Sequence, residues 1–114
     1  MLDPVYLQFL SQLAKGISQQ FGPNCEVVIH DLTGGTTEQS VVVIENGHVT
    51  GRKLGDGPSH VVLEALHSNR DNLEDHLNYL TKTKDGKILK SSTIYIRDDR
   101  GETVGIFAIN YDIT

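Results

Sequence analysis

Glycines and basic residues gather in the segment IENGHVTGRKLGDG, residues 44–57, directly after a β-branched run. These residue types suit a phosphate-binding loop, in which backbone N–H groups and a lysine surround the phosphates. The spacing does not fit, because Gly47 and Gly51 are four residues apart and Leu54 stands where serine or threonine is needed. A dinucleotide-binding fingerprint lacks its third glycine. The segment therefore predicts a loop without phosphate chemistry, in which Arg52 remains a candidate anion partner because its planar fork pairs with carboxylates and phosphates.

A metal site is the second chemistry that the residue types allow. His60, Glu64 and His67 fall on one face of a predicted helix, at spacings of four and three residues, and imidazole and carboxylate groups are metal ligands. The sequence contains no HExxH motif. Polar residues with this period are typical of the solvent-exposed side of an amphipathic helix, so we expect no metal here.

Acid–base or nucleophilic catalysis would need paired groups. His30 and Asp31 are adjacent in a predicted strand, and adjacent strand residues point to opposite faces. Cys25 is the only cysteine and begins the same strand, where a thiol without a neighbouring base is expected to be structural. No GxSxG motif occurs. We therefore predict that the domain is not an enzyme, with a small enzyme that uses His30, His48 or Cys25 as an alternative.

Polar residues inside apolar strands are the remaining candidates. Ser91, Ser92 and Thr93 lie in the middle of one predicted strand, and Asn110 and Asp112 share a face of the most apolar one. Buried polar groups need hydrogen-bond partners, which can be one another, water or a small polar ligand. The full candidate ligand-binding set consists of Asn46, His48, Thr50 and Arg52 at a loop rim, and Ser91, Ser92, Thr93, Asn110 and Asp112 on the sheet.

Two helices and several strands must position these candidates. Residues 4–21 are predicted helical, with Asp3 as N-cap, Pro4 in the first turn and Gly22 at the end. Asn46-Gly47 is a strong hairpin signal, so the residues after it are expected to return against the preceding strand. Strands are expected at 25–32, 39–45, 78–84, 87–99 and 103–113, a second helix at 59–69 capped by Ser59, a turn at 33–37 and a polar connector at 70–77.

This order of elements predicts an α+β fold. Tight turns between strands imply antiparallel neighbours, and we expect helices over one face of the sheet. The last strand, at 103–113, is apolar on both faces and is therefore predicted to be central. The apolar side of helix 4–21 is wider than one sheet contact needs, so this helix is expected to pack against a second copy and form a homodimer. Its main apolar stripe is predicted from Tyr6, Phe9, Leu10, Leu13, Ile17 and Phe21, with Val5, Leu7 and Ala14 beside it.

Length and composition narrow the class further. The 114 residues suit a single domain, 1–114. No apolar run is long enough to span a membrane, and a single cysteine fits a reducing, cytoplasmic location. The formal net charge of −5 argues against a nucleic-acid binder. Six of the ten basic residues lie between 82 and 100, where they are interpreted as a solvated hairpin face: Lys82, Lys84, Lys87, Lys90, Arg97 and Arg100.

Four stretches resemble a known family when taken together. FGPNCEVVIHDL, IENGHVTGRKLGD, NYLTKTKDGKILKSSTIYIRDD and GIFAINYD occur in the order found in the YheO-like PAS domain of bacterial transcriptional regulators. The resemblance covers nearly the whole chain. It implies a PAS-like, five-stranded antiparallel sheet with helices over one face and an N-terminal amphipathic helix.

The same resemblance implies a sensory and regulatory role. In that family the domain precedes a C-terminal helix-turn-helix segment that binds DNA, and this sequence stops before such a segment, at Thr114. The expected function is to bind a small polar or anionic ligand, to dimerise, or both, and to signal to that segment. A dimerisation scaffold without a ligand is the alternative. Some PAS domains hold flavin or haem. Cys25 is poorly placed for a flavin adduct and no histidine among His60, His67 and His76 stands out for haem, so the cofactor stays unassigned.

Overall fold

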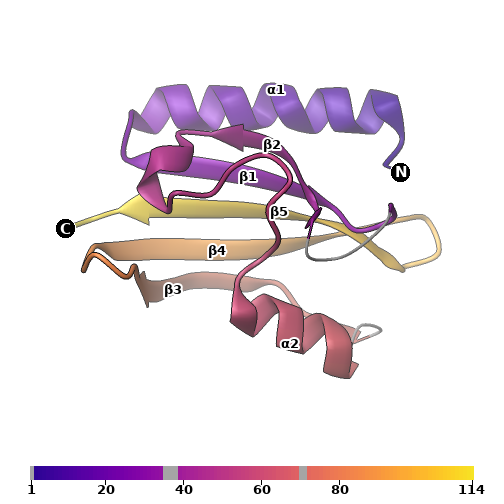
Figure 1. Cartoon of the computed structure of the whole chain (residues 1–114). Helices are drawn as coiled ribbons and strands as arrows, with labels where there is room; N and C mark the ends of the chain where they lie inside the picture. The colour runs from indigo at the N-terminus through magenta and orange to yellow at the C-terminus, as the bar shows by residue number, and fades with distance from the viewer. Residues whose placement is uncertain (1, 35–38, 70–71) are drawn as a thin grey trace.

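The computed structural model describes residues 2–34, 39–69 and 72–114 (Figure 1). Its elements are α1 (Pro4–Phe21), β1 (Cys25–Asp31), β2 (Val41–Glu45), the short 3₁₀ helix η2 (Gly47–Val49), α2 (His60–Asn69), β3 (His76–Lys82), β4 (Ile88–Arg97) and β5 (Thr103–Asp112). The predicted helices and strands are all present. The turn predicted at 33–37 and the start of the connector at 70–77 lie partly outside the described residues. Among the described helices, none has the length and apolar character to cross a membrane.

The five strands form one antiparallel sheet in the order β2-β1-β5-β4-β3. The central position predicted for the last strand is confirmed, because β5 pairs with β1 on one side and with β4 on the other. This topology places residues from opposite ends of the chain side by side. Glu26 of β1 lies opposite Asn110 of β5, and Asn110 lies opposite Ser91 of β4. The candidate polar residues of the strands are thus brought into register across the sheet.

Helix α1 begins and ends where the sequence predicts. The Asp3 side chain accepts a hydrogen bond from the backbone N–H of Val5 (2.9 Å), and Pro4 occupies the first turn. Gly22 ends the helix with a φ of 87°, and its N–H donates to the carbonyl oxygen of Ser18 (2.9 Å). A positive φ of this size is strained for any residue with a Cβ atom, which explains why glycine stands there.

The side of α1 that packs on the sheet shares Leu10 and Ile17 with the predicted stripe and differs from it in the other positions. Leu7, Leu10, Ala14 and Ile17 belong to the core cluster beneath the helix. Ala14 is fully buried, and its small side chain lets the helix approach the sheet closely. The sheet contacts only part of the wide apolar sector, so the remaining apolar residues face outward. These exposed residues are Val5, Tyr6, Phe9 and Leu13; Phe21 is exposed as well, but its ring contacts that of Tyr111 in β5 edge to face.

The two α-helices lie on opposite faces of the sheet (Figure 1). Alternate residues of a strand point to opposite faces, and Val27 and Ile29 pack with α1, whereas Ile106 and Ala108 pack with Leu66 of α2. The expectation of helices over one face thus holds for α2 and η2, while α1 covers the other face. We call these two surfaces the α1 face and the α2 face.

The hairpin predicted at Asn46-Gly47 is wrong. Asn46 does have a positive φ of 54°, but the following residues coil into η2. Asn46 Nδ2 donates to the carbonyl oxygens of Gly22 (3.1 Å) and Cys25 (2.9 Å), which fastens the turn to the start of β1. Gly47 lies so close to the carbonyl oxygen of Arg52 that a Cβ atom there would be 2.6 Å away. The chain therefore crosses over the α2 face and meets β2 again at Gly55 and Asp56, whose backbone groups form hydrogen bonds with Val41.

Candidate functional site

A pocket of about 770 Å³ lies on the α2 face of the sheet. Strands β4 and β5 supply its floor, η2 and the loop after it form one side, and β3 with the β3–β4 hairpin forms the other. The start of α2 also contributes to its lining. Pockets of a few hundred cubic ångströms that combine apolar walls with a few polar groups are the usual sites for small ligands.

Strand alternation decides which residues reach the floor. Ile106, Ala108 and Asn110 alternate along β5, and Thr93 of β4 lies opposite Ala108. Leu89, two steps of the alternation further along β4, also lines the pocket. The floor is therefore an apolar strip with a hydroxyl and an amide set into it.

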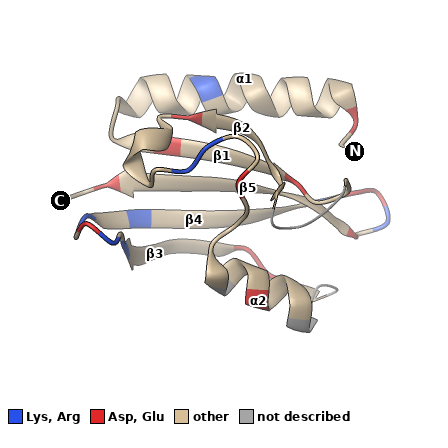
Figure 2. Ribbon diagram, viewed as in Figure 1, with Lys and Arg blue, Asp and Glu red and all other residues tan. Residues whose placement is uncertain are grey.

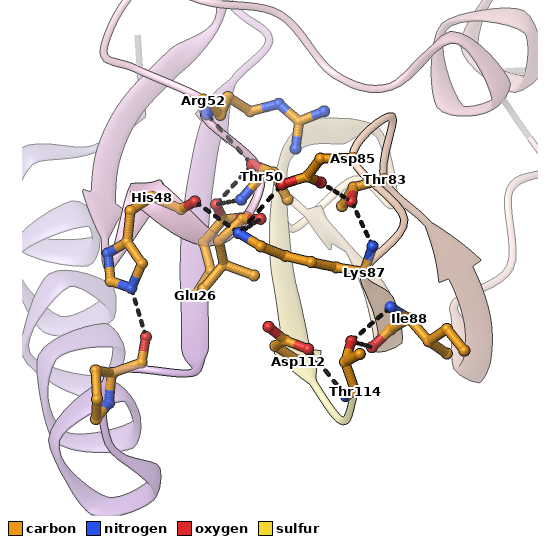
Figure 3. Close-up of polar contacts among 12 residues, drawn as sticks. Glu26, His48, Thr50, Arg52, Thr83, Asp85, Lys87, Ile88, Asp112 and Thr114 are labelled. Atoms are coloured by element: carbon orange, nitrogen blue, oxygen red, sulfur yellow. Dashed lines mark hydrogen bonds and ion pairs between the residues drawn. The ribbon is translucent and has the colours of Figure 1, made fainter.

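A fully buried carboxylate, Glu26 of β1, lies behind the pocket wall (Figure 3). Its Oε2 accepts hydrogen bonds from the backbone N–H (3.1 Å) and the Oγ1 hydroxyl (2.6 Å) of Thr50, and its Oε1 accepts one from Asn110 Nδ2 (2.8 Å). Burying a carboxylate is costly unless it is hydrogen-bonded. These three bonds therefore fasten the loop after η2 to β1 and β5.

The network extends from Asn110 to the far edge of the sheet. Ser91 Oγ donates to Asn110 Oδ1 (2.8 Å), and Thr81 Oγ1 lies 2.9 Å from Ser91 Oγ. Ser91 has only one hydroxyl hydrogen, so Thr81 must be the donor in the second contact. The donors of this chain of hydrogen bonds all point toward Glu26, and the network spans β3, β4, β5 and β1.

Tyr79 and Thr93 form a separate hydroxyl pair that lines the pocket. Tyr79 OH lies 2.6 Å from Thr93 Oγ1. The Tyr79 ring stacks on His76, with ring centroids 3.9 Å apart and planes 9° apart. The stacking fixes the direction of the phenol, so a hydroxyl pair is held in place at the β3 side of the pocket.

His30 is a buried imidazole, 2% exposed, at the edge of the pocket. Its Nδ1 lies 2.8 Å from Ser40 Oγ. Burial, and secondly the positive charge of Arg52, lower the pKa of His30 from 6.5 to about 4. At neutral pH it is therefore an uncharged hydrogen-bonding group. Asp31 does not assist it, because the Asp31 carboxylate accepts hydrogen bonds from Leu2 and Thr33.

The predicted rim residues occupy two kinds of position. His48, Thr50 and Arg52 line the pocket, whereas Asn46 does not. His48 Nε2 lies 2.8 Å from the carbonyl oxygen of Pro23, and Arg52 N–H donates to Thr50 Oγ1 (3.3 Å). The loop is therefore held from both sides, and the Arg52 side chain extends from a fixed backbone.

The predicted sheet residues divide in the same way. Thr93 and Asn110 line the pocket, and Ser91 is buried and hydrogen-bonded to Asn110. Ser92 lies on the α1 face, where its Oγ accepts a hydrogen bond from the Asn78 N–H (3.0 Å). Asp112, at the end of β5, accepts one from the Thr114 N–H (3.0 Å). The structure thus gathers His48, Thr50, Arg52, Thr93 and Asn110 around one pocket, and places Asn46, Ser92 and Asp112 away from it.

Sequence reasoning missed Glu26, Tyr79 and Thr81. A signal for Glu26 was present, because it interrupts the apolar run CEVVIHD at an even spacing from His30, so both residues share a strand face. A carboxylate in such a strand predicts buried hydrogen-bond partners. Nothing local marks Tyr79 or Thr81, whose roles depend on the pairing of β3 with β4.

The structure also locates the residues considered for metals and cofactors. Cys25 is buried on the α1 face, so its thiol cannot reach a ligand in the pocket. His60 lines the pocket and its Nε2 lies 3.1 Å from a carboxylate oxygen of exposed Glu64. Over the described ranges, no three metal-ligating side chains come together.

Comparisons with known proteins agree with this fold. A family model of the YheO-like PAS domain matches residues 2–114. The chain is 30% identical over 111 residues to a protein of Haemophilus influenzae, a match that covers 97% of this chain and 49% of that protein. It is 31% identical over 109 residues to YheO of Escherichia coli K12, covering 94% of this chain and 44% of YheO. The chain therefore spans about half the length of the curated relatives it matches.

Solved structures show the same fold at low sequence identity. The PAS domain of the fruit-fly ELK potassium channel has a TM-score of 0.52 and 20% identity, covering 88% of this chain and 96% of that one. The LOV domain of the blue-light photoreceptor Aureochrome1 has a TM-score of 0.55 and 16% identity, covering 90% and 82%. Sheet order, helix placement and family match therefore lead to one assignment: the chain belongs to the family of YheO-like PAS domains.

Proposed function

We propose that this domain is the sensory part of a bacterial transcription regulator, and that it responds to a small ligand bound in the pocket on the α2 face. The observation that supports this most is the pocket itself, in which Thr93, Asn110 and Tyr79 present polar groups from a rigid sheet. Groups on strands are held more precisely than groups on loops, as recognition requires. The proposed role is non-enzymatic.

The Glu26 network supports a link between occupancy and shape. Thr50 and Asn110 both line the pocket and both donate to Glu26. A ligand that takes a hydrogen bond from either residue therefore competes with a buried carboxylate, and the position of the loop after η2 changes with it. Such a two-state contact is what a ligand needs in order to shift a conformational equilibrium.

Ligand binding can be tested with a pocket-filling variant. Ala108 lies on the pocket floor, so Ala108→Met reduces the space for a ligand. Val42→Met places the same side chain at an exposed position of β2 and serves as the matched control. Native mass spectrometry of fresh protein and melting with a metabolite panel should reveal a ligand for the parent protein and the control, but not for Ala108→Met. If no compound binds the parent protein, the sensing role is contradicted.

We further propose that two copies associate through the exposed apolar residues of α1. Val5, Tyr6, Phe9 and Leu13 are 44–76% exposed, and α1 carries Lys15 as its only charged residue. An apolar, almost uncharged helix side is suited to pack against its own copy. Sedimentation should give a dimer, and the double variant Phe9→Ser, Leu13→Ser should give a monomer. A dimer without any ligand would favour the scaffold role, and a parent protein that stays monomeric at high concentration would contradict association.

DNA recognition is assigned to a segment outside this chain. The relatives are about twice as long as the match, which leaves room for a helix-turn-helix segment, and the net charge of −5 disfavours DNA binding by the domain itself. A cytoplasmic location is part of this proposal, because such a regulator acts on DNA. The domain alone should not retard duplex DNA at physiological salt.

A further inference from the structure

The mouth of the pocket has a charge opposite to that of the whole domain. The chain carries a net charge of −5, yet one arginine and three lysines line the pocket and only one carboxylate, Asp85, does so. Figure 2 shows basic residues on the loop after η2 and on the β3–β4 hairpin, the two segments that flank the pocket. The basic residues are Arg52, Lys82, Lys84 and Lys87. Basic groups that converge on a concave site attract anions.

Whereas Lys82 and Lys84 are exposed to solvent, Arg52 is the half-buried basic residue at this mouth whose side chain lacks a partner among the described residues. Its backbone N–H is bonded to Thr50 Oγ1, but its guanidinium forms no hydrogen bond or ion pair with the residues that the structure describes. The side chain is half-buried, so water satisfies it less fully than it would a surface arginine. Its five N–H donors in a planar fork match two oxygen atoms of a carboxylate or phosphate.

Lys87, in contrast, has partners for its ammonium group within the protein. Its Nζ lies 3.5 and 3.4 Å from the carbonyl oxygens of His48 and Val49, and 3.8 Å from Asp85 (Figure 3). This lysine joins the β3–β4 hairpin to η2, and Asp85 neutralises part of its charge. Asp85 in turn accepts a hydrogen bond from Thr83 Oγ1. Of the basic residues at the mouth, Arg52 is therefore the half-buried one whose charge no described residue offsets, and Lys87 shapes the opening beside it.

A cationic ligand fits this site poorly. The one carboxylate close to the floor, Glu26, is fully buried and already accepts three hydrogen bonds. His30, whose pKa is lowered to about 4, is uncharged at pH 7 and offers a cation no counter-charge. Below the mouth the pocket is apolar at Leu89, Ile106 and Ala108. The lining thus combines a cationic edge with an apolar floor.

We propose that the pocket binds a small organic anion whose carboxylate or phosphate group pairs with Arg52, while its short apolar body lies over Ile106 and Ala108. This inference rests on the proposed function, because it specifies the ligand of the same pocket.

Probes that share an apolar chain and differ in the head group test which head group the pocket prefers. Hexanoate, hexyl phosphate, hexanol and hexylamine are each titrated into the protein and followed by amide chemical shifts in NMR spectra. The two anions should shift amides of residues 50–53, 106 and 108 and bind at least about tenfold more tightly than hexanol or hexylamine, as expected for a charged hydrogen-bonded pair. The preferred anion, carboxylate or phosphate, identifies the head group.

Two charge-removing variants test the residue. Arg52→Gln should lower the affinity for hexanoate about tenfold or more, with little change in melting temperature. Lys90→Gln removes the same charge from an exposed position on β4 that does not line the pocket, and it should leave binding unchanged. Equal binding of hexanoate and hexanol, or unchanged binding to Arg52→Gln, would overturn the anion site. In that case, a neutral or cationic compound that binds the parent protein but not Ala108→Met would leave the sensing proposal intact.

Discussion

The two faces of this sheet are built from the same strands and do different things. Along β1, Val27 and Ile29 point to α1 and are sealed by it, whereas Glu26 and His30 point to the α2 face. The α1 face is an apolar core covered by a helix that packs along its length. The α2 face holds a hydrogen-bonded network and an open pocket of about 770 Å³.

The difference shows how one short strand contributes both to an apolar core and to a hydrogen-bonded network beside a pocket. Because strand side chains alternate, substitutions at two neighbouring positions affect opposite faces of the sheet. At Val27 and Ile29 the α1 face is fully buried, so volume changes there are costly. On the α2 face the pocket already supplies space, so the loss of polar contacts determines how much a substitution destabilises the domain. Four predictions test this contrast, from the largest expected effect to the smallest.

Ile29→Ala should destabilise the domain more than Ile106→Ala. Both side chains are almost fully buried, at 0% and 1% exposure. Ile29→Ala opens a cavity under α1 and should lower the free energy of unfolding by about 3–5 kcal/mol. Ile106 borders the pocket, so its loss enlarges an existing space and should cost about 2 kcal/mol. Urea unfolding of both variants measures the difference, and equal losses would mean that the two faces are equally close-packed.

His30 should make stability fall as the pH is lowered. Its pKa is about 4 in the folded state against an ordinary value of 6.5, so the unfolded chain binds the proton more readily. The stability tied to neutral His30 is therefore complete above pH 6.5 and is lost as the pH falls from 6.5 to 4, by on the order of 3 kcal/mol.

The measurement is the free energy of unfolding across that pH range. His30→Gln should lose the part of the pH dependence that His30 causes. His67→Gln, at an exposed position of α2, should keep it. A parallel pH profile for His30→Gln and the parent protein would show that His30 does not titrate in this way.

Asn110→Ala should break the network of the α2 face. It removes a donor to Glu26 and the acceptor of Ser91, and an unpartnered buried polar group costs about 1–3 kcal/mol. Ser92→Ala, the neighbouring hydroxyl on the α1 face, should stay within about 0.5 kcal/mol because Ser92 is only half-buried and bonds to an exposed backbone. Thermal melting distinguishes the two. An unchanged melting temperature for Asn110→Ala would mean that water replaces the amide.

Leu13→Ser and Leu10→Ser test the two sides of α1. Leu10 packs toward the sheet, so serine there should cost about 1–2 kcal/mol. Leu13 is 44% exposed, so its replacement should change the stability of the monomer by no more than about 0.5 kcal/mol. Unfolding at low protein concentration is the appropriate measurement. A large loss for Leu13→Ser under these conditions would indicate that the outer side of α1 contributes to the monomer fold.

Much of the fold followed from local pattern. The caps of α1 come from Asp3, Pro4 and Gly22, and the central position of β5 from its apolar residues on both faces. The α2 helix begins after Ser59, whose Oγ accepts a hydrogen bond from Val62 N–H (3.4 Å), as predicted. These features depend on neighbours in sequence or on strand periodicity, so the sequence alone could reveal them.

Features that depend on distant contacts could not be predicted in the same way. Asn46-Gly47 favours a hairpin locally, but two carbonyl groups near the start of β1 and the close approach of Arg52 select η2. The apolar sector of α1 is wider than its contact with the sheet, so the sequence does not show which side of the helix packs there. The pocket residues come from both halves of the chain, and the pairing of β1 with β5, of β5 with β4 and of β4 with β3 brings them together.

The buried thiol of Cys25 gives the α1 face a built-in probe of opening. It is the only cysteine in the chain, it is 1% exposed and it lies in the cluster that contains Ala14 of α1. Burial, and secondly the charge of Glu26, raise the pKa of this thiol in the closed fold, so it is unreactive there. The rate at which an aromatic disulfide labels the protein therefore follows the fraction of molecules in which α1 has left the sheet. Each labelling event reports the same movement, and if dimerisation clamps α1, that rate should fall as protein concentration rises.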